Sequence, residues 1–489
     1  MFLIALLGLP PLTAVLCRAF RAPSVIASIH ALGGFATLCL GLVVVGRVFA
    51  DGPVTAVGAS VYVDQLSAVL IAVIVVLDFA AALYSIGYLQ REVQSGAVPV
   101  SQLPWYYCGY HTFIWTMLVT VSVNNLGLLW VAVEATTLVS ALLVGFHRTP
   151  AALEAAWKYL ILCTVGIVIA LFGVLLTYYA STRLTAGESG LDWTVLMAHA
   201  GQLDPGIMRL AFVFVLIGFG TKAGLAPLHN WLPDAHSQAP SPISALLSGV
   251  LLECALYAIF RFHMLASIAV PGGFSSRALV TLGLISVSVA VPFIVVQRDL
   301  KRLLAYSSVE HVGLIATAIG LGGSLGLYAG ALHLFNHAIA KALLFFVAGN
   351  LTQRYGTTRM SRIRGVVRAM PVTGSLLLMG MFAITGLPPF AIFLSEFGIV
   401  GAGFAQGNWL AVAILIVALG IVFAAAFGHA LDMAFGRPRT SLEKLTFPRL
   451  RGGALAIPAG LMVLLGVYMP PAFNSALQQV AGLLASGPR

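Results

Sequence analysis

The sequence has 489 residues, of which 60% are hydrophobic and only 9% are charged. Soluble domains contain roughly 25% charged residues, so this composition excludes a soluble protein and indicates an integral membrane protein. The formal net charge of +10 does not indicate a nucleic-acid-binding protein, because the basic residues fall in short loops between apolar runs.

Apolar segments long enough to cross a bilayer recur along the whole chain. A transmembrane helix needs about twenty predominantly apolar residues. The sequence therefore predicts an all-α integral membrane protein in which residues 1–489 form a single polytopic domain. We expect about fourteen transmembrane helices, in chain order at residues 2–20, 25–48, 62–88, 105–123, 125–147, 157–180, 207–227, 238–263, 277–297, 303–322, 326–350, 370–401, 408–434 and 453–472. The first segment has no basic residues before it, so we expect a span and not a cleaved signal peptide.

The distribution of basic residues predicts the orientation. An even number of spans places both termini on one side of the membrane. With both termini outside, most of the 26 lysines and arginines fall in inward-facing loops, as the positive-inside rule requires. We expect a multi-pass protein of the inner (plasma) membrane, surrounded by the lipid bilayer, with both termini outside.

Two of the expected spans are interrupted. The seventh breaks at Leu225-Ala226-Pro227, and the twelfth breaks within Thr385-Gly386-Leu387-Pro388-Pro389. Paired interrupted helices in corresponding halves indicate internal repeats with sites near the middle of the membrane. We therefore predict two five-helix repeats, helices 4–8 (about 105–263) and helices 9–13 (about 277–434). Because five is odd, the second repeat is expected to be inverted.

The first repeat carries ionisable side chains inside or beside its apolar spans. Such groups are costly in lipid and usually mark an ion or proton path. We predict a proton relay that includes Glu134, Lys158, Lys222, His229 and Glu253. Two alternatives stay open: Glu134 and Lys222 form a purely structural ion pair, or Glu253 is a neutral, hydrogen-bonded acid.

The second repeat carries a stripe of polar side chains on one helix. His333, His337 and Lys341 are spaced four residues apart, so they share one helix face. Imidazole titrates near neutrality and can donate and accept a proton, so the stripe predicts a proton wire. The remaining relay members expected in this half are acidic or imidazole groups: Glu310, His311 and Glu396.

The pattern of possible metal ligands does not favour a metal or a cofactor. His-x-x-x-His spacing suits zinc, but no acidic residue adjoins it on this helix and no cysteine is near. The five cysteines occur singly, with no C-x-x-C pair, so we expect no iron–sulfur cluster in this chain. Asp78 and Asp432 lie within apolar spans, and the sequence assigns neither of them a role.

Four motifs together resemble a known family. They are P-L-H-N-W-L-P-D-A-H-S-Q-A-P-S-P (227–242), L-L-A-Y-S-S (303–308), H-L-F-N-H-A-I-A-K-A-L-L-F (333–345) and G-L-P-P-F (386–390). The chain resembles the antiporter-like subunits of respiratory complex I, a family that includes Mrp-type cation/proton antiporter subunits and membrane subunits of hydrogenase-4 and formate hydrogenlyase. Residues 307–313 look most similar to the hydrogenase-4 F-type subunit.

The resemblance implies a function. It implies a proton-translocating subunit without an active site of its own, driven by redox partner subunits, with other membrane subunits and a soluble redox arm as partners. It also implies that Lys222 pairs with Glu134, while Glu253 departs from the lysine usual in complex I homologues. The alternatives are a Mrp-type cation/proton antiporter subunit and a nontransporting scaffold. The resemblance does not identify the electron donor, or decide between protons and sodium.

Overall fold

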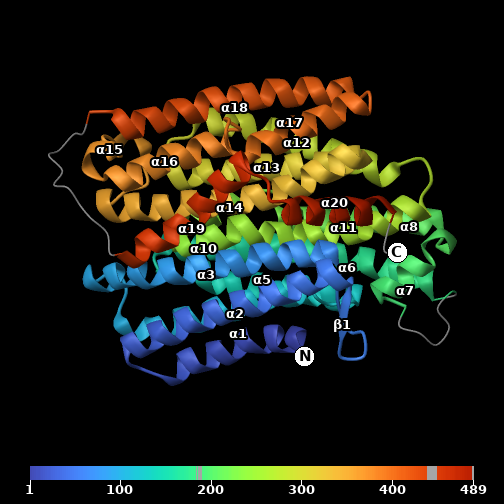
Figure 1. Ribbon diagram of the computed structural model, residues 1–489, viewed down its shortest axis with the longest axis horizontal. Helices are drawn as coiled ribbons and strands as arrows, with labels where there is room; N and C mark the ends of the chain where they lie inside the picture. The colour runs from blue at the N-terminus through green and yellow to red at the C-terminus, as the bar shows by residue number, and fades with distance from the viewer. Residues whose placement is uncertain (183, 185–189, 438–448, 487–489) are drawn as a thin grey trace.

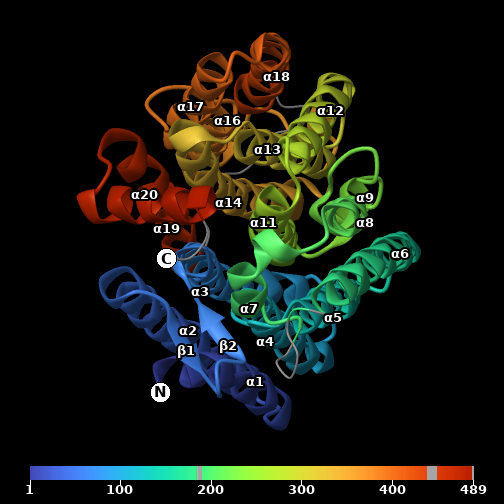
Figure 2. The same cartoon turned by 90° about the vertical axis from the view of Figure 1, so that its right-hand side faces the viewer.

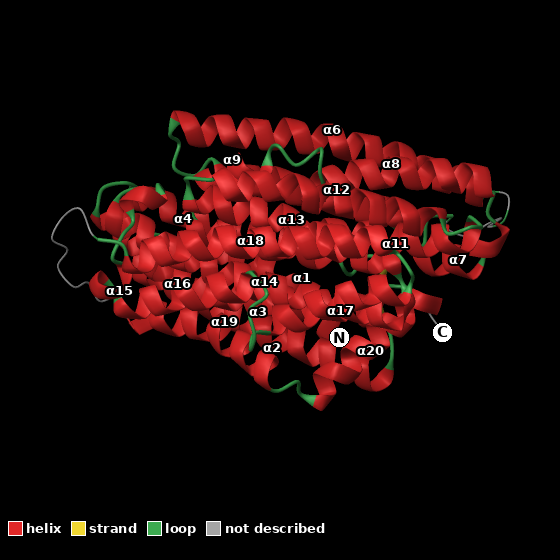
Figure 3. Cartoon of the chain, turned by 90° about the horizontal axis from the view of Figure 1, so that it is seen from above, coloured by secondary structure: helices red, strands yellow, loops and turns green. Residues whose placement is uncertain are grey.

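The computed structural model describes residues 1–182, 184, 190–437 and 449–486. Over these ranges the helices run side by side along the long axis, and the loops gather at the two ends (Figure 3). The start of α1 and the end of α20 lie toward the same end, opposite α15 (Figure 1). Four basic residues that contribute to the predicted orientation lie outside the described residues: Arg183, Arg439, Lys444 and Arg489.

The described chain is built from helices and one short hairpin. The α-helices are α1 Phe2–Ala19, α2 Pro23–Asp51, α3 Gln65–Gln94, α4 Leu103–Thr120, α5 Leu126–Val144, α6 Pro150–Ser181, α7 Trp193–Ala198, α8 Pro205–Ala223, α9 Leu232–Gln238, α10 Ser241–Leu246, α11 Leu252–Ala269, α12 Phe274–Val296, α13 Leu300–Leu321, α14 Gly323–Tyr355, α15 Val366–Ala369, α16 Pro371–Ile384, α17 Ala391–Ala405, α18 Trp409–Phe435, α19 Arg449–Val467 and α20 Pro471–Ser486. Short 3₁₀ turns are η1 Val100–Gln102, η2 Ala200–Gln202 and η4 Met360–Arg362, and η3 Leu247–Leu251 is a π-helical turn. Strands β1 Val54–Ala56 and β2 Val61–Val63 pair antiparallel.

A helix occupies every range where a span was expected. Of the described helices, 11 are long and apolar enough to cross a membrane, or up to 12 if the bent pair at 451–467 and 471–485 counts as one span. The expected span at 105–123 is α4, which is helical but does not reach the apolarity of those helices. The expected span at 370–401 is two shorter apolar helices, α16 and α17. The protein is therefore a mainly helical membrane protein.

The centre and the periphery of the bundle differ in burial. Helix α14 lies near the middle of the bundle, surrounded by α3, α11, α13 and α16 (Figure 2). Peripheral helices expose large apolar side chains; on α6 these include Trp157, Ile161, Val165 and Phe172. An apolar outer surface suits contact with lipid, where an ordered helix satisfies its own backbone hydrogen bonds.

Polar caps define several helix starts. The Asp64 carboxylate accepts from the Ser67 N–H at 3.0 Å at the start of α3. The Asp204 carboxylate accepts from the Ile207 N–H at 2.8 Å on α8, and Pro205 occupies its first turn. Such caps satisfy backbone donors that have no partner within the helix. The expected span at 62–88 therefore starts later than predicted, after the hairpin β1–β2.

The predicted break in the seventh span is present. Helix α8 ends at Ala223, and Gly224 adopts a left-handed conformation with φ 80°. Side chains bind the backbone groups near this end: the Trp231 Nε1–H donates to the Thr221 carbonyl at 2.8 Å, and the Ser286 hydroxyl accepts from the Ala226 N–H at 2.9 Å. Packed protein groups thus replace the helical hydrogen bonds that the break removes.

The predicted break in the twelfth span is also present. Helix α16 ends at Ile384, α17 begins at Ala391, and Gly386 between them has φ 68°. His311 Nε2 lies 3.1 Å from the Ile384 carbonyl oxygen, which can only accept, so the imidazole donates there.

The eighth span is not the uniform helix that was expected. Helix α10 continues through the π-helical turn η3 into α11, immediately before Glu253. Single π turns inside α-helices occur frequently at functional sites, because they change the direction of the following side chains.

Candidate functional site

Lys222 lies in the last turn of α8 with its side chain fully buried. Its ammonium group donates to the Thr137 hydroxyl of α5 at 2.9 Å and to the Tyr159 hydroxyl of α6. It also lies 4.6 Å from the centroid of the Tyr159 ring. The Tyr159 hydroxyl is in turn 2.7 Å from the Ser140 hydroxyl. Hydroxyl groups and an aromatic face therefore surround this ammonium.

Glu134 on α5 was expected to pair with Lys222, directly or through water, and among the described residues it makes no direct contact with the ammonium. Its Oε1 accepts from the Thr164 hydroxyl at 2.8 Å, and its Oε2 has no hydrogen-bond partner. No ion pair within 4.0 Å joins it to Lys222 in the described part of the chain. Thr137, one turn after Glu134, takes the place of the carboxylate beside the ammonium. The two charges remain electrostatic neighbours.

Lys158 is placed differently from the prediction. Its side chain is about half exposed and pairs with Glu154 at 2.5 Å and with Asp234 at 3.5 Å. Successive residues of an α-helix point about 100° apart, so on α6 Tyr159 faces the interior and Lys158 does not. The structure thus removes Lys158 from the buried group, and Tyr159 occupies the place expected for it.

His229 also lies apart from the other predicted relay members. It follows the α8 break, and its ring is 6.2 Å from that of Tyr306 and 6.3 Å from that of Phe293. Its Nδ1 is buried without a hydrogen-bond partner. The surroundings of His229 are therefore aromatic.

Glu253 and His337 meet in the centre of the bundle. Glu253 Oε1 on α11 lies 3.3 Å from His337 Nδ1 on α14, and both side chains are fully buried. Glu253 Oε2 and His337 Nε2 have no protein partner. This contact connects the two halves of the chain that were expected to be repeats.

Three histidines form a hydrogen-bonded and stacked group beside the second break. His311 Nδ1 lies 2.8 Å from His333 Nε2, and His333 Nδ1 lies 2.9 Å from the Ser395 hydroxyl. The ring of His311 also stacks on that of His337, with 5.3 Å between the ring centroids. Because His311 donates from Nε2 to a backbone carbonyl, a neutral His311 must accept a hydrogen bond at Nδ1 from the Nε2–H of His333. The arrangement therefore has the donor and acceptor order of a proton wire.

Lys341 lies one helical turn beyond His337 on α14. Its ammonium donates to the Leu304 carbonyl at 2.8 Å and to the Ser307 hydroxyl. Glu310 is an electrostatic neighbour of both Lys341 and Glu396. One oxygen of each carboxyl, Glu310 Oε2 and Glu396 Oε1, is buried without a partner. This group extends the polar region from α13 to α17.

The hydroxyl groups that bind these charges were not predicted as site residues. They are Thr137, Tyr159, Thr164, Ser307 and Ser395. The predicted relay consists of ionisable side chains inside apolar segments. Hydroxyl side chains carry no charge and are common in such segments, so they do not stand out in the same way. For Thr137 the sequence does contain a signal, because it lies one helical turn after Glu134. The two imidazoles of the His-x-x-x-His motif bind different partners, so they do not converge on a common ligand.

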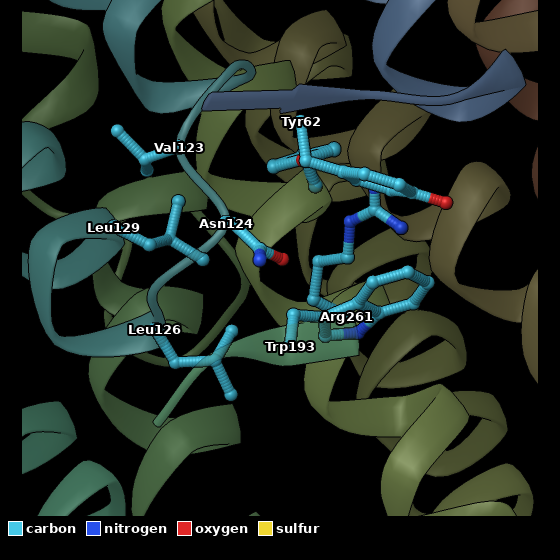
Figure 4. A pocket seen from close by; sticks show the side chains of 8 residues that line it. Tyr62, Val123, Asn124, Leu126, Leu129, Trp193 and Arg261 are labelled. Atoms are coloured by element: carbon cyan, nitrogen blue, oxygen red, sulfur yellow. The ribbon is translucent and has the colours of Figure 1, made fainter. Parts of the chain in front are cut away.

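A second buried ion pair lies near the hairpin end of the bundle. Arg261 on α11 donates to both oxygens of Asp64, at 2.6 and 2.7 Å. Its guanidinium lies 4.1 Å from the Trp193 ring centroid, beside Tyr62, in a pocket also lined by Asn124 (Figure 4). Arg261 lies near the end of the expected span at 238–263, and its side chain is buried inside the bundle.

The two aspartates without an assigned role are in opposite environments. Asp432 is mostly exposed and lies 3.5 Å from Arg364. Asp78 on α3 is fully buried, and neither of its carboxyl oxygens has a hydrogen-bond partner.

The chain is similar in sequence to several known membrane proteins. The family described as NADH:quinone oxidoreductase/Mrp antiporter, transmembrane, matches residues 123–422. The chain is 41% identical over 433 residues to a protein named hydrogenase-4 component F homolog from Methylacidiphilum infernorum (isolate V4), which covers 87% of this chain and 89% of that protein. It is 30% identical over 414 residues to NADH-quinone oxidoreductase subunit N from Desulforudis audaxviator (strain MP104C), over 83% of this chain and 79% of that protein.

The fold also has a solved counterpart. A chain from the membrane-bound sulfane sulfur reductase, an archaeal respiratory membrane complex, superposes with a TM-score of 0.88 and 26% identity. The match covers 99% of this chain and 98% of that chain. All the candidate relay residues lie within the matched range 123–422.

Proposed function

Because this chain belongs to the NADH:quinone oxidoreductase/Mrp antiporter transmembrane family, we propose that it is a proton-translocating membrane subunit of a complex I-like or hydrogenase-4-type oxidoreductase. Other membrane subunits and a soluble redox arm are its proposed partners. The redox reaction is assigned to those partners, and this chain provides the proton path.

The contact between Glu253 and His337 is the main structural support for this proposal. It joins the Lys222 region of the first half to the Lys341 region of the second half through two fully buried ionisable groups. Buried ionisable groups within membrane spans are costly and usually functional. Water would complete the step between Lys222 and Glu253, whose Oε2 has no protein partner.

The proposed path contains two protonatable regions. Lys222, with Glu134 nearby, forms the first; His337, Lys341, Glu310 and Glu396 belong to the second, together with the wire through His311 and His333. A change of charge in one region alters the electrostatic field at the other, because the low dielectric of the bundle screens charges weakly. Redox-driven movement in partner subunits would start this exchange.

The proposed arrangement in the membrane follows the predicted topology. The chain would cross the inner membrane fourteen times, counting α4, the pair α16–α17 and the bent pair α19–α20 as one span each in addition to the 11 long apolar helices, with both termini outside. The two five-helix repeats would be inverted relative to each other. The two breaks support this, since one ends α8 and the other separates α16 from α17, at corresponding places in the two proposed repeats.

The test is Glu253→Gln in the assembled complex. The amide keeps the shape and hydrogen bonding of the acid but cannot titrate. We expect proton translocation into vesicles to fall by at least about tenfold, since groups that transfer protons contribute roughly 10²–10⁴-fold to such steps. Assembly, followed by co-purification of partner subunits, should be unchanged.

The matched control is Glu154→Gln, which changes an exposed carboxylate on α6 that pairs with Lys158. This variant should translocate protons at the wild-type rate. Wild-type translocation by Glu253→Gln would show that Glu253 is a neutral structural acid, and would overturn the path proposed here.

A Mrp-type cation/proton antiporter subunit is the second candidate, because the matched family includes both kinds of protein. The same vesicles distinguish the two. Proton movement that depends on a sodium gradient and continues without the redox substrate would favour the antiporter.

A further inference from the structure

Three titratable side chains are buried together outside the proposed relay. They are His30 on α2, Asp78 on α3 and His111 on α4, and each is fully buried. All three also lie before residue 123, where the family match begins. The proposed path through Lys222, Glu253 and Lys341 does not use them.

The two histidines pair through the same two nitrogens, at the same distance, as a histidine pair in the relay, although their rings cross at 72° instead of 24°. His30 Nδ1 lies 2.8 Å from His111 Nε2, and His311 Nδ1 lies 2.8 Å from His333 Nε2. In such a pair one nitrogen donates and the other accepts, so the pair shares a proton between two helices. The outer nitrogens, His30 Nε2 and His111 Nδ1, are buried without a partner and remain able to accept or donate another.

Asp78 lies on the face of α3 that packs against α2. A Cβ added at Gly34, one turn after His30, would lie 3.9 Å from Asp78 Oδ1. Both carboxyl oxygens of Asp78 are buried, and neither has a hydrogen-bond partner among the residues that the structure describes. An ionised carboxylate in that position would be unpaired, which is strongly unfavourable inside an apolar bundle.

Tyr110 contacts both Asp78 and the histidine pair. Its hydroxyl donates to the Asp78 main-chain carbonyl at 2.6 Å, and it is an electrostatic neighbour of Asp78. Its ring contacts those of His30 and His111 edge-on, at 4.7 and 5.3 Å.

Two other titratable groups face this cluster from the surrounding helices. The Tyr107 ring on α4 lies 4.3 Å from the His30 ring, and Cys17 on α1 is an electrostatic neighbour of Tyr107.

Helix α3 separates this cluster from the relay. Leu77, the residue before Asp78, points away from the cluster and toward Gly249 of η3. A Cβ added at Gly249 would lie 3.0 Å from the Leu77 Cδ1 atom. The cluster therefore faces the outer layer formed by α1 and α2 (Figure 2).

We propose that Asp78, His30 and His111 form a second proton-binding site, which holds one exchangeable proton. In one state the proton is on the Asp78 carboxyl, and the imidazole pair is neutral. When the proton leaves, it passes from the carboxyl oxygen through an imidazole nitrogen to the medium, and the imidazole pair is again neutral. The bound and released states differ by one proton, so the carboxyl titrates with the pH of the medium.

Infrared difference spectroscopy during pH steps tests the site, using the full chain reconstituted in lipid nanodiscs. We expect a carboxylic acid carbonyl band that titrates with pH, and that disappears in Asp78→Asn. In His30→Gln the band should persist but titrate at a different pH, by about one unit or more, because the neighbouring proton acceptor is lost. The control Asp51→Asn removes an exposed carboxylate at the end of α2 and should leave the band unchanged.

Two results would overturn the proposal. If the Asp78 band is constant at every pH, the residue is a permanently neutral structural acid. If His30→Gln leaves the titration unchanged, the carboxyl and the histidines do not share a proton. Since His30→Gln retains Asp78, it keeps the test valid even if Asp78→Asn does not fold. The measurement needs no transport, so it is independent of the relay proposed above.

Discussion

Lys222 and Lys341 are both buried, and both direct their ammonium groups at oxygens of uncharged groups. Lys222 donates to Thr137 and Tyr159, and Lys341 donates to Ser307 and a backbone carbonyl. A hydroxyl can accept from an ammonium and can donate to a neutral amine. Each lysine can therefore keep its hydrogen bonds in both charge states.

Lys222→Met tests whether the buried Lys222, in contrast to the surface residue Lys158, takes part in proton translocation. Methionine keeps an unbranched apolar side chain but removes the ammonium. We expect proton translocation to fall by at least about tenfold, while the matched variant Lys158→Met stays close to the wild type because its side chain is about half exposed. Vesicle acidification measures both. Equal loss in the two variants would contradict the placement of Lys222 on the path.

Arg261→Ala tests the buried ion pair with Asp64. Removing one partner leaves the other charge buried and unpaired, which costs roughly 3–5 kcal/mol. We expect the free energy of unfolding in mixed micelles to fall by about that amount. The control, Arg364→Ala, removes the partner of the exposed Asp432 and should change it by only about 0–1 kcal/mol. Similar values for the two variants would show that the Arg261 pair is solvated.

At the scale of the helix, both interruptions are held by side chains from other elements. Trp231 binds a carbonyl at the end of α8, and His311 binds one at the end of α16. The second case connects the break directly to the histidine wire, since the same imidazole contacts His333. The helix end and the wire are therefore mechanically coupled: a change in the hydrogen bonds of His311 affects both.

Gly386→Ala tests the packing at this second break. A Cβ at Gly386 would collide with the Glu396 carboxyl group, in addition to the strain of its positive φ. Such overpacking costs about 1–3 kcal/mol, so we expect lower thermal stability and slower proton translocation. Gly407→Ala is the control, because Gly407 has a similar φ of 65° but no atom within 4 Å of an added Cβ. If both variants behave alike, backbone strain explains the effect and the contact with Glu396 does not.

At the scale of the whole molecule, ionisable groups gather along the central helices and apolar side chains cover the periphery. The start of α1 and the end of α20 lie toward one end of the bundle, and α15 lies at the other (Figure 1). Several arginines lie in or just before α15, including Arg359, Arg362, Arg364 and Arg368. The positive-inside rule predicts that this end faces the cytoplasm.

Reporter fusions test this orientation. A reporter fused after Arg489 and another fused after Arg362 should report opposite sides of the membrane, with Arg489 outside. A third fusion before Met1 should agree with the one after Arg489. Identical signals from Arg489 and Arg362 would show that the predicted topology is wrong.

The sequence by itself determined the class of protein, the positions of the helices and the two breaks. Apolar length and the placement of glycine and proline are local properties, and helix formation in lipid depends mainly on them. The sequence also located the central charges Glu253, His337 and Lys341, because ionisable residues are rare in apolar segments. The motifs were sufficient to predict the family.

Only the tertiary structure decided which side chains meet. It placed Thr137 and Tyr159 around Lys222, turned Lys158 toward the surface, and brought His30 to His111 across 81 positions in the chain. These outcomes depend on the rotation of each helix about its own axis and on the neighbours it packs against. In nearly uniformly apolar helices the sequence carries little periodic signal for that rotation, since lipid-facing and protein-facing residues are equally hydrophobic.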